Sequence, residues 1–99
     1  MSIEVTLYTR PGCHLCEDAK EVMLPLLGEF GAILREVNIG EDHELTQRFG
    51  HDIPVIFIGE RKAAKHRVDR EQFRRQLKEA RRDVAGGLLR KMLERFKRV

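Results

Sequence analysis

Two cysteines separated by two residues are the side chains whose chemistry is most distinctive in this sequence. They lie in Cys13-His14-Leu15-Cys16, and the 99-residue chain contains no other cysteine. Two cysteines are too few to cross-link a disulfide-rich scaffold. At this spacing they indicate redox chemistry or metal binding. The pair follows a predicted strand and opens a predicted helix, where unpaired peptide N–H groups and the helix dipole stabilise negative charge. We therefore expect the pKa of Cys13 to lie below the ordinary value of about 8.5.

Thiol–disulfide exchange is the reaction that such a pair supports. Cys13 attacks a substrate disulfide to form a mixed disulfide, and Cys16, one helical turn further on and more buried, resolves it. Arg10 and His14 place positive charge nearby, His14 only when it is protonated. The sequence therefore predicts Cys13 and Cys16 as the catalytic residues.

Metal binding is the competing interpretation of the cysteines. A closed zinc site needs four ligands, usually two pairs, whereas this chain offers one cysteine pair. The four histidines form no C-x-x-C…H-x-x-x-H pattern; they are His14, His43, His51 and His66. We expect no bound metal, and two inert cysteines would be the remaining alternative.

The strand and helix that position the pair follow from hydrophobic periodicity. Apolar and polar side chains alternate from Ile3 to Tyr8, which predicts a strand, and residues 9–12 break it. From Cys13 to Leu27 the apolar residues recur at helical spacing. Pro25 should kink or end this helix, because proline lacks the N–H that the helical ladder needs.

The rest of the chain alternates between strands and helices. We expect a strand over 33–39, a helix over 41–49, a buried strand over 55–58, a tight turn at Gly59-Glu60 and an edge strand over 61–66. Asp69 can cap a third helix, whose core stripe is Phe73, Leu77, Ala80 and Val84. Gly86-Gly87 should separate it from a final amphipathic, basic helix (84–98) carrying Leu88, Leu89, Met92, Leu93 and Phe96. We favour ordinary packing for that helix.

Length and composition fit one small domain spanning residues 1–99. With 41% hydrophobic residues the chain can form one core, which we place within residues 3–83. No apolar run reaches the roughly 18 residues of a membrane helix, so we expect no membrane association. The first residues carry no basic and apolar leader, so we expect a cytoplasmic protein.

Charge is unevenly divided along the chain. Residues 1–60 hold 4 Lys/Arg and 11 Asp/Glu, a net −7, whereas residues 61–99 hold 15 and 5, a net +10. Such asymmetry can indicate an acidic or nucleic-acid partner. We favour basic helices that pack on the acidic half and neutralise it. The basic half has only Phe73 and Phe96 as aromatic residues, so we expect no nucleic-acid partner.

Pro54 is the second informative residue, because it begins the buried strand. A cis Ile53–Pro54 bond would turn the backbone of Ile53 outward, where its N–H and C=O could pair with an extended thiol peptide. Taken alone, a proline before a strand is more often trans, so the residues leave both forms open.

Together these segments resemble the glutaredoxin family of the thioredoxin superfamily. The similarity covers about residues 3–83 and is carried by Val5-Thr6-Leu7-Tyr8, Thr9-Arg10-Pro11-Gly12-Cys13-His14-Leu15-Cys16 and Ile53-Pro54-Val55-Ile56-Phe57-Ile58-Gly59. It implies an α/β, thioredoxin-like fold of the glutaredoxin type, with a mixed four-stranded sheet flanked by helices and an extra C-terminal helix. It also implies a cis Pro54, Cys13 as nucleophile and Cys16 as resolving thiol.

The resemblance further implies a substrate-binding surface. Arg10 matches a basic position three residues before the nucleophile, and Ile53, beside Pro54, matches the residue whose backbone binds glutathione. Asp69 matches one acidic position at the start of the third helix, and His14 lies within the cysteine motif itself.

This chain departs from the family pattern at several of those positions. Asp52 stands where threonine is usual, and its charge would repel the carboxylates of glutathione. His14 and Leu15 replace a proline and an aromatic residue, and residues 65–69 lack the usual Gly-Gly pair. The departures predict that glutathione is used poorly and that protein disulfides are reduced.

The sequence thus predicts a monomeric, cytosolic dithiol–disulfide oxidoreductase. Its substrates would be protein disulfides or glutathione mixed disulfides, with no tightly bound cofactor and with glutathione or a separate reductase as electron donor. The alternative is a redox-switched binding module that uses the basic helix 84–98 and turns over little. A third class is an iron–sulfur or zinc carrier.

Overall fold

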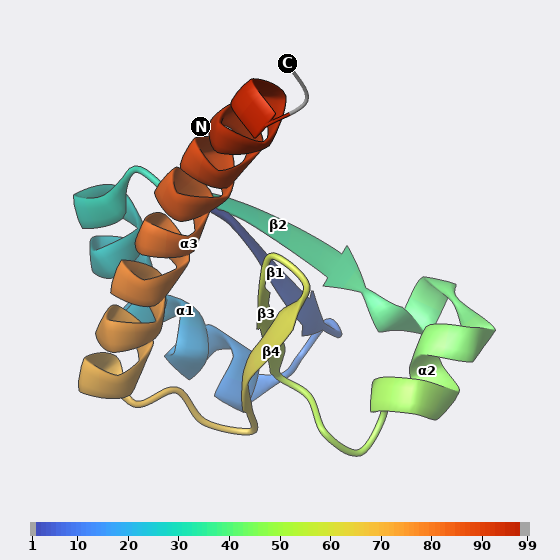
Figure 1. The fold of residues 1–99 in the computed structure, drawn as a ribbon. Helices are drawn as coiled ribbons and strands as arrows, with labels where there is room; N and C mark the ends of the chain where they lie inside the picture. The colour runs from blue at the N-terminus through green and yellow to red at the C-terminus, as the bar shows by residue number, and fades with distance from the viewer. Residues whose placement is uncertain (1, 98–99) are drawn as a thin grey trace.

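A computed structural model describes the backbone of residues 2–97 and the side chains of residues 2–83. Its elements are β1 (Glu4–Thr9), α1 (His14–Phe30), β2 (Ile33–Asn38), the 3₁₀ helix η1 (Ile39–Glu41), α2 (His43–Phe49), β3 (Val55–Ile58), β4 (Arg61–Lys65) and α3 (Arg70–Lys97). The strands form one sheet in the order β2-β1-β3-β4 (Figure 1). β1 runs parallel to β2 and antiparallel to β3, and β3 is antiparallel to β4. The expected mixed, four-stranded sheet is confirmed.

Two helices cover one face of this sheet. α1 and α3 lie side by side there (Figure 1), and their apolar stripes meet the inward side chains of the strands. The alternation read from the sequence places Val5 and Leu7 of β1 on this face, both fully buried. Each large side chain buried here contributes about 1.5–3 kcal/mol. The cluster consists of Ile3, Val5, Leu7, Ala19, Met23, Leu26, Leu27, Ile56, Ile58, Phe73 and Leu77.

A second, smaller cluster forms on the opposite face, where α2 packs against one end of the sheet. The ring of Tyr8 lies 4.6 Å from that of Phe49 and 5.7 Å from that of Phe57, measured between centroids. Ile39 and Val55 are completely buried in the same cluster. Aromatic pairs add about 0.5–1.5 kcal/mol beyond burial, so this cluster stiffens the end of the sheet at which β1 stops.

Two effects were predicted for Pro25, a kink or an end of the first helix, and the predicted end is wrong. α1 runs through Pro25 to Phe30 and ends at Gly31, which adopts a left-handed φ of 61°. The two residues after the proline, Leu26 and Leu27, are 1% and 4% exposed. Their burial in the core compensates for the one backbone hydrogen bond that proline cannot make.

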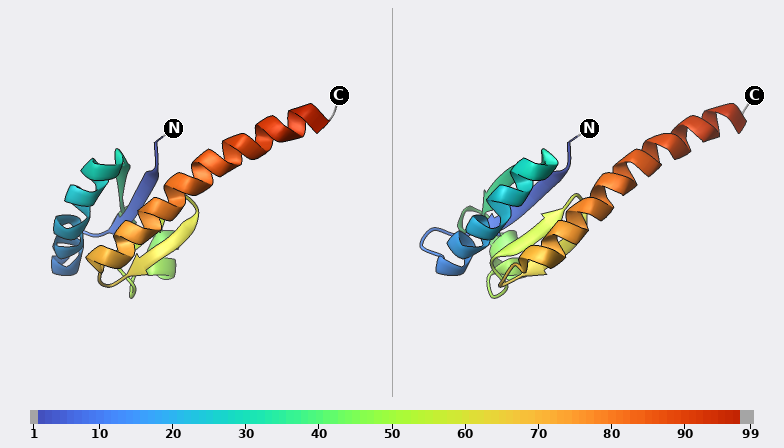
Figure 2. Two further views of the ribbon diagram at one scale, coloured as in Figure 1. Left: turned by 60° about the vertical axis from the view of Figure 1, so that its left-hand side comes forward. Right: turned by 90° about the vertical axis from the view of Figure 1, so that its left-hand side faces the viewer.

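The predicted break at Gly86-Gly87 is also wrong, and the final helix is not a separate element. α3 is one helix of 28 residues. Figure 2 shows that its last turns extend well past the sheet. A glycine inside a helix costs about 1 kcal/mol but keeps its N–H, so two of them need not end the helix. The side chain of Val84 and the stripe from Leu88 to Phe96 lie outside the described side chains.

Contacts between α1 and α3 join the acidic and basic halves of the chain. Arg74 pairs with Glu29 at 2.5 Å, and the guanidinium of Arg81 lies 4.7 Å above the ring of Phe30. These contacts fit the favoured interpretation that the basic helix packs on the acidic half. No helix within residues 2–97 is long and apolar enough to cross a membrane.

The variant Pro25→Ala tests how far Pro25 lowers the free energy of unfolding. We expect Pro25→Ala to raise the free energy of unfolding by about 1–3 kcal/mol, because alanine restores an N–H and removes the ring. Urea denaturation of the oxidised protein measures the change. Leu24→Ala, at an adjacent side chain that is 54% exposed, is the control and should change stability by less than about 0.5 kcal/mol. A loss of stability in Pro25→Ala would contradict this account.

Candidate active site

The two cysteines lie where β1 turns into α1. Gly12 adopts a φ of 79°, and the N–H of Cys13 donates to the carbonyl of Arg10 at 3.3 Å, which closes a tight turn. Cys13 is the N-cap of α1, with φ −87° and ψ 108°. The sequence prediction that the pair opens a helix is therefore confirmed.

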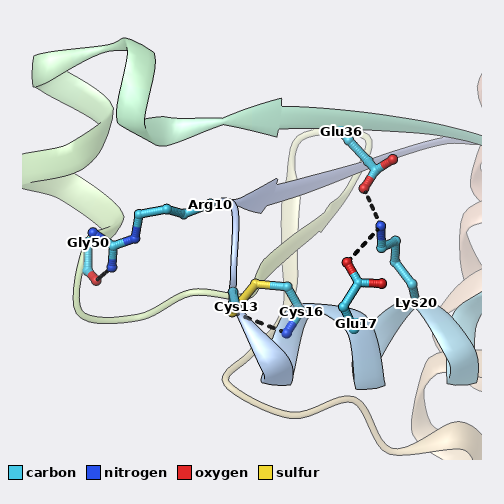
Figure 3. The surroundings of a disulfide bond; sticks show 7 residues. All are labelled: Arg10, Cys13, Cys16, Glu17, Lys20, Glu36 and Gly50. Carbon is cyan, nitrogen blue, oxygen red and sulfur yellow. Dashed lines mark hydrogen bonds and ion pairs between the residues drawn. A yellow bond between two sulfur atoms is a disulfide. The ribbon is translucent and has the colours of Figure 1, made fainter.

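The sulfur atoms occupy different environments within this turn (Figure 3). The backbone N–H of Cys16 donates to Sγ of Cys13 at 3.2 Å, and the two residues form a disulfide with their Cα atoms 5.3 Å apart. Cys16 is 1% exposed, whereas Cys13 is only partly buried. The expected difference in burial is confirmed. An external reactant therefore reaches Cys13 more easily than Cys16.

The loop before β3 leaves the sheet at the same end as the cysteine turn. Tyr8, at the end of β1, pairs with Val55, at the start of β3, so the segments 9–13 and 50–54 adjoin. The Ile53–Pro54 peptide bond is cis. Pro54 is buried, and Ile53 is half-buried against the α2 cluster. The structure thus brings the predicted residues Ile53 and Pro54 to the end of the sheet that carries the cysteines.

Arg10 links these two segments. Its Nη2 donates to the carbonyl oxygen of Gly50 at 3.3 Å. In Figure 3 the side chain extends from the cysteine turn toward Gly50 and away from the disulfide. The residue predicted to bind substrate therefore contacts the end of α2 in the oxidised structure.

The remaining predicted site residues lie at two helix starts. His14 is the first residue of α1 and is exposed. Asp69 precedes α3, where Oδ2 accepts from the N–H of Gln72 at 3.0 Å and the carbonyl accepts from the N–H of Phe73 at 2.9 Å. The predicted capping role of Asp69 is confirmed.

Sequence reasoning missed His66 as part of this region. His66 follows β4 with a φ of 68°, and its Nε2 lies 3.1 Å from the carbonyl oxygen of His51 and 3.7 Å from Oδ1 of Asp52. The one available signal was the missing Gly-Gly pair in residues 65–69. A hollow of about 250 Å³ adjoins it, lined by Leu15, Asp18, Ala19, Val22, His66, Arg67 and Val68.

Lys20 lies one helical turn beyond Cys16 and ties α1 to β2 (Figure 3). Its Nζ is 2.9 Å from Oε1 of Glu36 and 3.2 Å from Oε1 of Glu17. Hydrogen bonds to Glu36, and secondarily to Glu17, raise the pKa of Lys20 above its usual value. The lysine therefore stays positively charged throughout the range in which thiols ionise.

A second hollow and a metal centre are the two alternatives to the cysteine turn as the functional site. A larger hollow of about 670 Å³ lies at the opposite end of the sheet, between the start of β1, the β3–β4 turn and α3. Among the described side chains, no group of three or more His, Cys, Asp and Glu could hold a metal ion. The candidate site is accordingly the cysteine turn with the loop before β3.

Known proteins resemble this chain in sequence and in fold. Residues 4–78 match the family described as Glutaredoxin-like domain (DUF836). A glutaredoxin-like protein of Dictyostelium discoideum is 33% identical over 78 residues, covering 73% of this chain and 72% of that protein. The solved structure of protein XcR50 from X. campestris has a TM-score of 0.64 at 28% identity, over 75% of this chain and 95% of that one.

A further solved structure is similar in fold alone. The thioredoxin Deadhead of Drosophila melanogaster has a TM-score of 0.55 at 17% identity, over 79% of this chain and 80% of that one. Together with the mixed sheet, this likeness confirms the thioredoxin-like fold that the sequence predicted.

The contrast between the two sulfur atoms can be measured in the reduced protein. We expect iodoacetamide to alkylate Cys13 at a lower pH than Cys16, because the N–H groups and dipole of α1 favour its thiolate while burial disfavours that of Cys16. The single variants Cys13→Ser and Cys16→Ser assign each rate. Equal pH profiles for the two thiols would contradict the assignment.

Proposed function

The chain belongs to the family of proteins with a glutaredoxin-like domain, and on that basis we propose that it is a dithiol–disulfide oxidoreductase that reduces protein disulfides or glutathione mixed disulfides. The observation that carries the proposal is the placement of Cys13 at the N-cap of α1, with its sulfur accepting the N–H of Cys16. A thiolate held in this way is both a nucleophile and a good leaving group.

The first step is attack on the substrate. The thiolate of Cys13 attacks one sulfur of the substrate disulfide, a new S–S bond joins Cys13 to that sulfur, and the second substrate sulfur leaves as a thiolate that takes a proton from solvent. Partial exposure of Cys13 lets a disulfide on another protein reach it.

The second step releases the substrate. The thiol of Cys16 loses its proton and attacks Sγ of Cys13, the mixed disulfide breaks, and the other substrate sulfur leaves as a thiolate. Two electrons have then passed to the substrate, and the chain holds the Cys13–Cys16 disulfide seen in the structure.

The electron donor must return two electrons to that disulfide. Two molecules of glutathione or the dithiol of a reductase would supply them, and the reducing cytoplasm favours this direction. Asp52 bears on the choice, because a carboxylate beside Ile53 repels the carboxylates of glutathione. We propose protein disulfides as the main substrates, with glutathione a poor partner.

Loss of either sulfur should have a distinct effect. Cys13→Ser should abolish reduction of a protein disulfide, with either glutathione and its reductase or thioredoxin reductase as donor. Cys16→Ser should still complete the first step, so that a mixed disulfide with Cys13 accumulates on a non-reducing gel. Turnover that persists in Cys13→Ser would refute the proposed function.

The charge of Asp52 can be tested with a glutathionylated substrate. Asp52→Thr should lower the KM for that substrate by a factor of about 2–5, because one repulsive charge contact in a water-exposed site costs at most ~1 kcal/mol. A protein disulfide without a nearby carboxylate is the control substrate, and its KM should not change. An unchanged or higher KM for the glutathionylated substrate in Asp52→Thr would contradict the repulsion argument.

The length of α3 supports a second candidate function. Its backbone continues as helix past the sheet (Figure 2), and the sequence of residues 84–98 is amphipathic and basic. In this alternative the segment binds a partner protein, and the cysteines act as a redox switch with little turnover. A truncation after residue 83 distinguishes the two: an enzyme keeps disulfide reduction, whereas a binding module loses its partner.

A further inference from the structure

The connector between β4 and α3 holds a histidine in a backbone conformation that favours glycine. His66 has a φ of 68°, and it is the one non-glycine residue with positive φ in the part of the chain that the structure describes. This region is unfavourable for residues with a Cβ atom and persists only where the surroundings enforce it. The side chain of His66 therefore calls for an explanation.

Every described polar contact of His66 is made to the segment 51–54. Its backbone N–H donates to the carbonyl of Pro54 at 2.8 Å and approaches that of Asp52 at 3.3 Å. The ring Nε2 lies 3.1 Å from the carbonyl oxygen of His51, which can only accept, so the ring donates. The same nitrogen lies 3.7 Å from Oδ1 of Asp52.

Glycine at this position could make only some of these contacts. It would adopt the same φ without strain and keep both backbone contacts, but it has no ring to reach His51. His66 also lines the hollow that Leu15, inside the cysteine motif, borders. The side chain thus adds one hydrogen bond to the loop.

We propose that His66 is a positioning residue, which holds the segment 51–54 so that the peptide group of Ile53 is presented to an extended protein substrate. This role deepens the proposed function and depends on it. His51 and Asp52 precede Ile53, and Pro54 follows it, so the contacts of His66 bracket the peptide that the substrate would pair with. The residue touches neither sulfur and acts through the loop.

The test uses the full chain with His66→Gly. We expect the unfolding midpoint to stay the same or rise, because glycine fits the left-handed backbone. We expect the KM for a protein disulfide to rise about 3- to 10-fold, the effect of losing one hydrogen bond, with kcat and the pH profile of Cys13 alkylation unchanged. Amide hydrogen exchange at Ile53 should become faster.

Two further variants make the comparison sharper. His66→Asn tolerates positive φ but is too short to reach His51, so it should reproduce the higher KM and the faster exchange. Lys65→Ala removes an exposed charge from the adjacent position and should leave both readouts at the wild-type values.

The possible failures can be told apart. A lower unfolding midpoint in His66→Gly, with kcat and KM both impaired, would mean that the ring serves folding, and the proposal would be wrong. Wild-type KM and wild-type exchange at Ile53 in His66→Gly would overturn the role of His66 alone, provided that turnover depends on Cys13. Absence of Cys13-dependent turnover in the wild-type chain would overturn the proposed function and this role with it.

Discussion

The amide of Cys16 directed at the sulfur of Cys13 is the contact on which the rest of the site depends. It exists because Cys13 is the N-cap of α1, where the N–H of Cys16 in the first turn has no partner within the helix and donates to the sulfur. In the reduced protein, a donor in this position would favour the thiolate of Cys13 over its thiol.

The sheet fixes the loop before β3 at the same end that carries Cys13. Pairing of Tyr8 with Val55 places the cysteine turn and the loop before β3 at one end of the sheet. The aromatic cluster with Phe49 covers this end from the α2 side. Arg10 then joins the cysteine turn to Gly50. The turn and the loop are thus held by strand pairing, by packing and by a hydrogen bond between residues 40 positions apart.

Local signals in the sequence located most of this arrangement. Alternation identified β1, a continuous apolar run identified β3, and the spacing of cysteines at a helix start identified the site. Neither Pro25 nor Gly86-Gly87 ends its helix. An internal proline costs about 3 kcal/mol or more and a glycine about 1 kcal/mol, and burial or continued hydrogen bonding can offset such costs. The partner of Arg10 and the conformation of His66 depend on residues far along the chain, which no local pattern reports.

The burial of Cys16 limits where a reductant can attack the disulfide. An incoming reductant cannot reach a sulfur that is 1% exposed, so its thiolate must attack the disulfide at Cys13 and expel Cys16. In the proposed reaction, the substrate and the electron donor would then both react at Sγ of Cys13, so they would exclude each other. If the chain is the proposed oxidoreductase, attack at Cys13 in both steps gives it ping-pong kinetics.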